Sequence, residues 1–96
     1  MGGRPWPGRL TVEQLMYFVY ILKSLKDGNN YVGLTSNTQN RLDYHNSGRV
    51  KSTKYRRPLI LVYEESHATR QEAREREKYL KSYKGAKEKL SIIDSL

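Results

Sequence analysis

The sequence predicts an α+β protein whose elements follow the order β-β-α-β-α-α. Three short segments rich in β-branched and aromatic residues are typical of strands. Three other segments carry capping residues or glycines at their ends, as helices do. The 96 residues suffice for one compact domain with a small core. We expect residues 1–15 to be an irregular amino-terminal arm and residues 16–96 to form the single domain.

The first two strands are predicted to form a hairpin. Residues 17–22, Tyr-Phe-Val-Tyr-Ile-Leu, show no polar alternation, which is typical of a strand covered on both faces. Residues 27–29, Asp-Gly-Asn, supply turn chemistry because Gly and Asn tolerate positive φ. Residues 31–35 are then the return strand. Gly33 inside this strand costs stability and usually marks the close approach of another group.

A short helix should follow the hairpin. Ser36 or Asn37 can cap its start, and it should run to about Asn46, where Gly48 is placed to end it. Residues 48–58 are predicted to form a polar loop before the next strand.

The second half begins with a third strand at residues 59–63, where Pro58 is acceptable because it precedes the strand. Residues 69–72, Thr-Arg-Gln-Glu, fit a capping box and predict a helix that runs to about Tyr83. A last short helix is expected over residues 86–93.

The composition restricts the possible functions. A net charge of +8 and a pI near 9.8 predict a polyanionic partner, either nucleic acid or an anionic membrane surface. The absence of cysteine excludes a disulfide framework and a thiolate zinc site. No apolar run has the length of a spanning helix, and the amino terminus lacks the apolar segment of a secretory signal. We therefore expect a soluble, cytoplasmic protein without a membrane partner.

Glu77 is the most informative single position. Together with Ala73 and Leu80 it occupies positions i, i+4 and i+7, which share one helix face. That face carries the few apolar residues of a strongly charged helix and should be turned toward the sheet. A carboxylate there is costly unless it is paired or binds a cation. Glu77 is therefore a candidate metal ligand, and the alternative is a partner for a buried arginine.

Arg41 and His45 are four residues apart, which brings them together on one face of the first helix. An arginine can fork onto phosphate oxygens and stabilise charge in a transition state. A histidine at this distance can orient a water, bind the phosphate or transfer a proton. The alternative for both residues is a solvated helix face.

Tyr20 and Tyr31 lie on the paired strands, so their rings could meet in one cleft. A phenol with a pKa near 10 is a poor base unless a neighbouring cation lowers that pKa. Arg41 or a bound metal would supply the cation. The alternative is that both are core aromatics whose hydroxyls are satisfied at the rim.

The loop between the first helix and the third strand is strongly basic and is predicted to clamp phosphates, with one tyrosine available for stacking on an exposed base. A plain solvated loop is the alternative. The residues predicted to bind nucleic acid are Arg49, Lys51, Lys54, Tyr55, Arg56 and Arg57. A second group of cations near the carboxyl end carries little signal, because lysines at helix ends also favour the helix dipole. These lysines are Lys81, Lys84, Lys87 and Lys89.

Five features of the chain occur in a characteristic order: Phe-Val-Tyr at residues 18–20, Tyr-Val-Gly at residues 31–33, Arg41, His45 and Glu77. This set resembles the GIY-YIG nuclease superfamily, and in particular its small stand-alone bacterial members. The two triplets stand where the family has Gly-Ile-Tyr and Tyr-Ile-Gly, with a phenylalanine in place of the first glycine. The three single residues match the family's catalytic arginine, a position often occupied by histidine or tyrosine, and the metal-binding glutamate.

The resemblance implies a small three-stranded antiparallel sheet flanked by helices, and hydrolysis of phosphodiester bonds with one metal ion. In that mechanism Glu77 would hold Mg²⁺ or Mn²⁺, and Arg41 would neutralise a non-bridging oxygen. Tyr20 or Tyr31 would activate or position the attacking water, with His45 assisting. Ligation by one carboxylate and several waters suits magnesium.

The leading hypothesis is a metal-dependent endonuclease acting on DNA. Cleavage of branched, single-stranded or damaged DNA in repair or recombination is the role considered first. The alternative is a nucleic-acid-binding module with weak or no catalytic activity. A third hypothesis is an RNA-binding or ribosome-associated protein, because phosphate contacts alone do not distinguish RNA from DNA.

Overall fold

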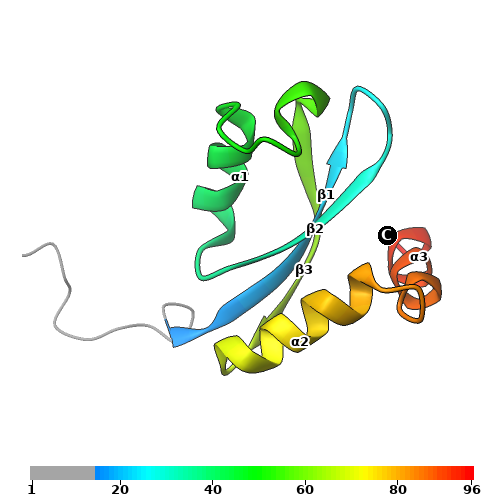
Figure 1. Cartoon of the computed structure of the whole chain (residues 1–96). Coiled ribbons are helices and arrows are strands. Elements are labelled where there is room, and N and C mark those ends of the chain that lie inside the picture. Colours follow the sequence, from blue (N-terminus) through cyan, green and yellow to red (C-terminus); the bar gives the residue numbers. More distant parts are fainter. Residues whose placement is uncertain (1–14) are drawn as a thin grey trace, which may run out of the picture.

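The computed structural model describes residues 15–96, which form an α+β domain (Figure 1). The expected order of elements and the three-stranded antiparallel sheet are confirmed. Apart from Leu15, the arm expected at residues 1–15 lies outside the described residues. In chain order, the elements are β1 (Tyr17–Ser24), β2 (Asn30–Thr35), α1 (Thr38–Asn46), the 3₁₀ turn η2 (Lys54–Arg56), β3 (Leu59–His67), α2 (Arg70–Lys81) and α3 (Ala86–Asp94).

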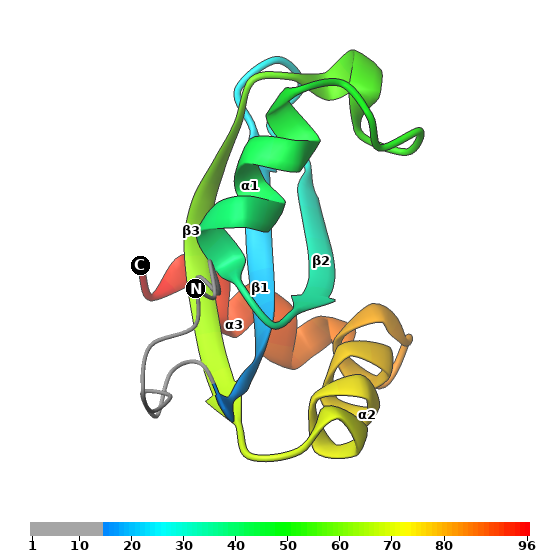
Figure 2. The same cartoon turned by 90° about the vertical axis from the view of Figure 1, so that its left-hand side faces the viewer.

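The sheet has the order β2-β1-β3, so β1 is the central strand and both neighbours pair with it in antiparallel fashion. Because helices cover both faces, all four residues from 19 to 22 are buried, as the unalternated sequence predicts. Figure 1 shows α1 on one side of the sheet and α2 and α3 on the other. Figure 2 shows α1 lying across the face of the sheet.

Alternate residues of β1 serve two separate cores, because successive side chains of a strand point to opposite faces. Val19 and Ile21 pack with Ala73 and Leu80, which α2 supplies. On the other face, a second cluster, under α1, consists of Tyr20, Leu22 and Leu59, with Tyr31, Leu42 and Leu61 at its border. The phenol of Tyr20 thus belongs to the α1 face of the sheet.

The third strand is four residues longer than the sequence predicts. It continues from Tyr63 to His67, and residues 64–67 pair with residues 17–20 of β1. Glutamate is a poor strand former, but pairing with the central strand outweighs that preference. Glu65 is stabilised there because its carboxylate accepts hydrogen bonds from Tyr63 and Arg76. The expected end of the strand at Tyr63 was therefore wrong.

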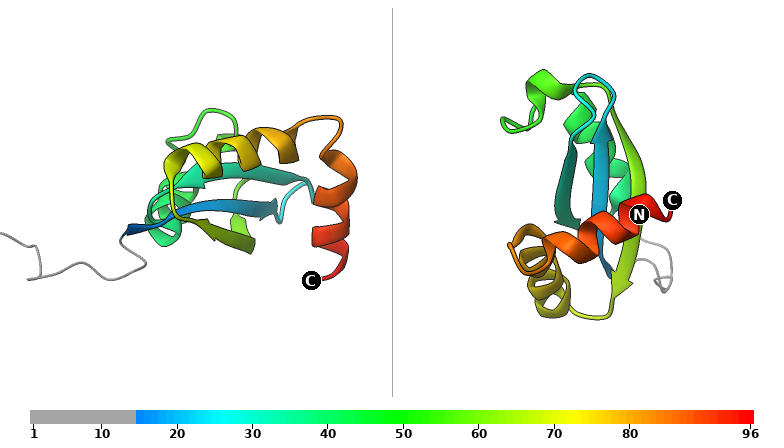
Figure 3. Two further views of the ribbon diagram at one scale, coloured as in Figure 1. Left: turned by 90° about the horizontal axis from the view of Figure 1, so that it is seen from below. Right: turned by 90° about the vertical axis from the view of Figure 1, so that its right-hand side faces the viewer.

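The helix boundaries agree more closely with the sequence. Asn37, one of two candidates, caps α1 because its side-chain oxygen accepts a hydrogen bond from the Asn40 amide at 2.9 Å. Thr69 caps α2 in the same way through the Glu72 amide at 3.1 Å. That helix ends at Lys81, two residues before the expected end. Figure 3 shows that the chain then turns and that α3 runs across the direction of α2.

Candidate active site

Tyr20 lies directly opposite Gly33 in the pairing of β1 with β2, and its phenol crosses the glycine backbone. A Cβ atom added at Gly33 would overlap the Cζ and Oη atoms of the ring and lie 2.8 Å from its Cε2 atom. The expectation that this strand glycine marks the close approach of another group is confirmed. The glycine is required because the phenol occupies the space that any larger residue would fill.

His45 is completely buried and holds this phenol in place. Its Nε2 atom is 2.9 Å from the hydroxyl of Tyr20, and its Nδ1 atom is 2.8 Å from the hydroxyl of Thr53. Thr53 is itself fully buried. A neutral imidazole has one donor and one acceptor nitrogen, so both of its hydrogen-bonding groups have partners here. The solvated helix face considered for His45 is excluded.

The environment keeps this imidazole uncharged. Burial, and to a smaller extent the positive charge of Arg41, lower the pKa of His45 from 6.5 to about 4. At neutral pH the ring is therefore neutral. With both nitrogens engaged and no exposed surface, it is placed to orient the phenol of Tyr20 and not to touch a substrate phosphate.

Tyr31 completes an aromatic cluster with these two residues. Its ring centroid is 4.9 Å from that of His45 in an edge-on arrangement and 6.3 Å from that of Tyr20. The two tyrosines differ in exposure, because Tyr20 is 1% exposed whereas Tyr31 is only half-buried. The structure therefore brings both predicted phenols and the predicted imidazole to one place.

The pKa of Tyr20 is raised to about 12, above its ordinary value of 10.0. Burial is the main cause, and hydrogen bonding to Arg41 only partly opposes it. The expected lowering of a phenol pKa by Arg41 alone is therefore not found at Tyr20. In this state the phenol keeps its proton at neutral pH.

Arg41 lies beside the same phenol and remains charged. Burial disfavours the guanidinium charge, but hydrogen bonding to Tyr20 and the proximity of Tyr31 and Tyr44 outweigh burial and raise the pKa of Arg41. Its guanidinium carbon is 5.1 Å from the ring centroid of Tyr44. Arg41 also lines an open cavity of about 290 Å³ at the start of α1, so part of it is accessible to a ligand.

Glu77 approaches the aromatic cluster from α2, which packs against β1 and β2. Ala73 and Leu80 on the same helix face are fully buried, as their spacing predicts. The Glu77 side chain is 18% exposed, and its charge contributes to the raised pKa of Tyr20. Its partner is not a buried arginine but Lys81, whose Nζ donates to Oε2 at 3.0 Å.

Lys81 links this carboxylate to the aromatic residues. Its Nζ atom lies 5.6 Å from the ring centroid of Tyr31 while it binds Glu77. Sequence reasoning placed Lys81 among uninformative lysines and gave Thr53 no role. The signal for Lys81 was its spacing of four residues from Glu77, which puts the two on one helix face. Nothing in the sequence singled out Thr53, since its contact with His45 depends on the path of the loop.

The surroundings of Glu77 fit a magnesium ion held by one carboxylate. Its Oε1 atom makes no hydrogen bond to any residue between 15 and 96. Within the same residues no group of three or more His, Asp or Glu side chains forms a metal cluster. Mg²⁺ keeps several waters and commonly takes only one or two carboxylates together with substrate phosphates. A single carboxylate oxygen without a hydrogen-bond partner among residues 15–96 suits that coordination.

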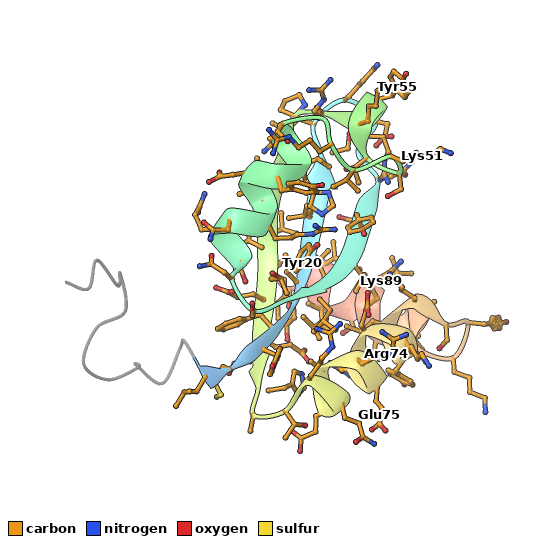
Figure 4. All side chains as sticks on the ribbon, turned by 60° about the vertical axis from the view of Figure 1, so that its left-hand side comes forward. Tyr20, Lys51, Tyr55, Arg74, Glu75 and Lys89 are labelled. Carbon is orange, nitrogen blue, oxygen red and sulfur yellow. The ribbon has the colours of Figure 1, made fainter. Side chains whose placement is uncertain are left out.

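The predicted basic loop lies at one end of the molecule. Figure 4 shows Tyr55 and Lys51 there, whereas Tyr20 is near the middle of the sheet. Tyr55 is 73% exposed. Arg56 is bound to Asp27 at 3.2 Å, and Arg57 donates from Nε to the Lys54 carbonyl at 2.8 Å.

Arg49, by contrast, lies next to α1, with its guanidinium carbon 5.8 Å from the Tyr44 ring centroid. Among the predicted nucleic-acid-binding residues, Arg56 and Arg57 therefore bind other groups of the protein. Lys51, Lys54 and Tyr55 are exposed.

These features define a class of protein. Two tyrosines lie on paired strands, an arginine and a histidine lie on the following helix, and a glutamate lies on a later helix, as the resemblance to GIY-YIG nuclease domains implies. The model of the GIY-YIG catalytic domain matches residues 16–90, and the chain belongs to this family. The family is one of nucleases, so its members are hydrolases of nucleic acid.

Its relatives include small bacterial proteins of similar length. The chain is 40% identical over 79 residues to the UPF0213 protein SH2523 of Staphylococcus haemolyticus, which covers 81% of this chain and 94% of that protein. It is 44% identical over 78 residues to a UPF0213 protein of Staphylococcus aureus, and this match covers 80% of this chain and 93% of that protein.

A solution NMR structure is known for the UPF0213 protein BH0048 from Bacillus halodurans, whose sequence is 32% identical to this chain. The match has a TM-score of 0.48 and covers 80% of this chain and 84% of that chain.

No helix between residues 15 and 96 is long and apolar enough to cross a membrane.

Proposed function

We propose that the protein is a divalent-metal-dependent endonuclease that hydrolyses phosphodiester bonds in DNA. The observation that carries the proposal is the convergence of Tyr20, Arg41 and Glu77 from three different elements. The guanidinium of Arg41 partly offsets the effect of burial on the pKa of this phenol, to which the charge of Glu77 adds. Lys81, which binds Glu77 at 3.0 Å, lies 5.6 Å from the ring centroid of Tyr31. A positive side chain and a free carboxylate oxygen around buried phenols can bind a phosphate and a cation together.

Each residue has a distinct task in this proposal. Glu77 would hold Mg²⁺ or Mn²⁺, and the bound ion supplies charge stabilisation to the reacting phosphate. Arg41 forks onto a non-bridging oxygen and offsets the negative charge that develops there. His45 fixes the direction of the Tyr20 hydroxyl through the bond at 2.9 Å.

Tyr20 and Tyr31 remain alternatives for the group that handles the attacking water. Tyr20 is held rigidly, but burial raises its pKa and makes loss of its proton costly. Tyr31 is more exposed, and the ammonium group of Lys81 lies over its ring. Substitution of each tyrosine by phenylalanine separates the two assignments.

The expected substrate is DNA, with RNA as a possible second substrate, because the chain carries a net charge of +8. Cleavage of branched, single-stranded or damaged DNA during repair or recombination, in the cytoplasm, is the setting that we propose.

One observation favours a second candidate function. The exposed Tyr55 and the cations near it lie away from Tyr20, so they could bind nucleic acid without any cleavage. The protein would then be a nucleic-acid-binding module with weak or no activity. In that case neither Glu77 nor Arg41 would affect the measured affinity by more than a surface charge does.

Nicking of supercoiled and branched DNA, with and without magnesium, tests the proposal. The variants are Glu77→Gln and Arg41→Gln, and Glu75→Gln is the matched control because Glu75 is an exposed carboxylate of the same helix. Metal-dependent cleavage that is lost in the first two variants and kept in the control supports the endonuclease. Cleavage unaffected by all three would identify a contaminant, and binding without cleavage would favour the binding module.

A further inference from the structure

A basic cavity lies at the same end of the molecule as Tyr55, apart from the aromatic cluster of Tyr20, Tyr31 and His45. It has a volume of about 420 Å³ and opens to solvent. Its lining combines three cationic side chains with an exposed aromatic ring and contains no carboxylate. The lining residues are Lys26, Asn46, Lys54, Tyr55, Arg57 and Pro58.

The three cations reach this cavity from the turn after β1 and from the loop around η2. Lys26 belongs to the turn after β1, Lys54 begins η2, and Arg57 follows η2. Over residues 15–96, none of them forms a salt bridge with Asp or Glu. The neighbouring Arg56 differs, because Asp27 binds it at 3.2 Å. The fold thus leaves three positive charges side by side around one cavity.

Hydrogen bonds fix the backbone that carries these charges. Ser24 is fully buried, and its hydroxyl donates to the Arg56 carbonyl at 2.6 Å while accepting from the Lys26 amide at 3.1 Å. The turn after β1 is therefore tied to the loop. The guanidinium of Arg57 lies against Gly48, where a Cβ atom would be 2.7 Å from Nη1. A cavity whose cations are positioned in advance binds an anion at a lower entropic cost.

Phosphate oxygens are the acceptors that suit this set of donors. Tyr55 beside the cavity is 73% exposed, and the Nζ atom of Lys54 lies 5.1 Å from its ring centroid. An exposed aromatic ring next to phosphate-binding cations is the combination that proteins use to bind single-stranded nucleic acid, with a base stacked on the ring.

We propose that this cavity binds a backbone phosphate of the nucleic-acid substrate and that Tyr55 stacks on an adjacent unpaired base. The proposal rests on the proposed function, since it takes the substrate to be nucleic acid. The cavity lies past the end of β1, whereas Tyr20 lies within that strand.

Two hydrogen bonds fix the position of the cavity relative to the aromatic cluster. Thr53, directly before Lys54, binds the Nδ1 atom of His45, and His45 binds the phenol of Tyr20. A strand held in the cavity would therefore be presented to Tyr20 at a constant distance. Substrates with unpaired bases near the cleaved bond should be preferred.

Fluorescence anisotropy of a labelled single-stranded DNA of about 16 nucleotides, measured without metal, reports binding and tests this proposal. The variant Lys26→Gln/Lys54→Gln should bind about tenfold more weakly, and the slope of log K against log salt should fall in magnitude by about 0.7. Tyr55→Ala should weaken binding without changing that slope. The charge-matched control Lys84→Gln/Lys87→Gln replaces two exposed lysines elsewhere and should bind within about twofold of the wild type.

Equal losses in the cavity variant and the control, or no binding of DNA by the wild type, would overturn the inference. Thermal unfolding of each variant shows whether the exposed substitutions leave the fold intact. Because the assay contains no metal, its result does not depend on cleavage. A wild type that binds through the cavity but never cleaves would contradict the proposed function alone, and one that cleaves without using the cavity would contradict this inference alone.

Discussion

The burial of His45 makes the stability of the protein depend on pH in a defined range. In the unfolded chain this residue binds a proton at its ordinary pKa of 6.5, whereas in the folded protein the pKa is about 4. Between these values the unfolded state binds more protons, so acid favours unfolding. The stabilisation is fully present above pH 6.5 and is lost as the pH falls toward 4.

The magnitude follows from the difference between the two pKa values. Each unit of difference between the two pKa values contributes about 1.4 kcal/mol to the free energy of unfolding, so the full contribution of His45 is about 3 kcal/mol. About 2 kcal/mol of it is lost between pH 7 and pH 5. Asp27 and Glu65 also have lowered pKa values, but their unfolded values of 3.8 and 4.5 place their effects at lower pH.

Urea unfolding at pH 7 and pH 5 measures this difference, with NMR titration of the imidazole as a direct check. We expect the free energy of unfolding of the wild type to fall by about 2 kcal/mol. The variant His45→Gln should lose most of that pH dependence, whereas His67→Gln should keep it. The same pH dependence in wild type and His45→Gln would refute the reasoning, because it would show that the buried imidazole is not held neutral.

Three further predictions follow from the contacts around this site. Gly33→Ala should cost about 1–3 kcal/mol in urea unfolding because its Cβ meets the phenol of Tyr20, and a second substitution, Tyr20→Leu, should recover part of the loss; additive losses would argue against the overlap. Thr53→Val should cost about 1–3 kcal/mol, since it leaves a buried imidazole nitrogen without a partner, and a neutral effect would contradict the bond at 2.8 Å. Lys81→Met should raise the calorimetric affinity of Glu77 for Mg²⁺ by about two- to fivefold by removing a competing charge, with Lys78→Met as the control, and equal effects of both variants would exclude competition at the carboxylate.

The fold was largely predictable because its signals are local. Capping residues set the starts of α1 and α2, and the lack of alternation in the first strand correctly predicted that both of its faces are covered. The length of β3 was not predictable in this way. Its last four residues, 64–67, are polar, and they form a strand only because β1 extends beside them. Pairing between distant segments decides such a boundary, and no local preference reports it.

In the candidate site, too, local spacing was predictable from the sequence and contacts between distant segments were not. The helix face that Glu77 shares with Ala73 and Leu80 was correctly predicted to turn toward the sheet. The spacing of Arg41 and His45 indicated only that the two share one face of their helix. The burial of His45 could not be predicted, because it depends on Thr53 arriving from the loop. The pKa of Tyr20 also differed from the expectation, since burial outweighs the charge of the neighbouring arginine.

The most direct test of the account is whether a metal ion bound by Glu77 lies beside the phenols and Arg41. Mn²⁺ broadens the NMR signals of nuclei close to it, so a titration of the labelled protein locates the ion. We expect selective broadening at Tyr20, Tyr31 and Arg41 in the wild type and in Glu75→Gln, and none of it in Glu77→Gln. Broadening that persists in Glu77→Gln, or that falls on residues away from this cluster, would contradict a shared metal and phosphate site.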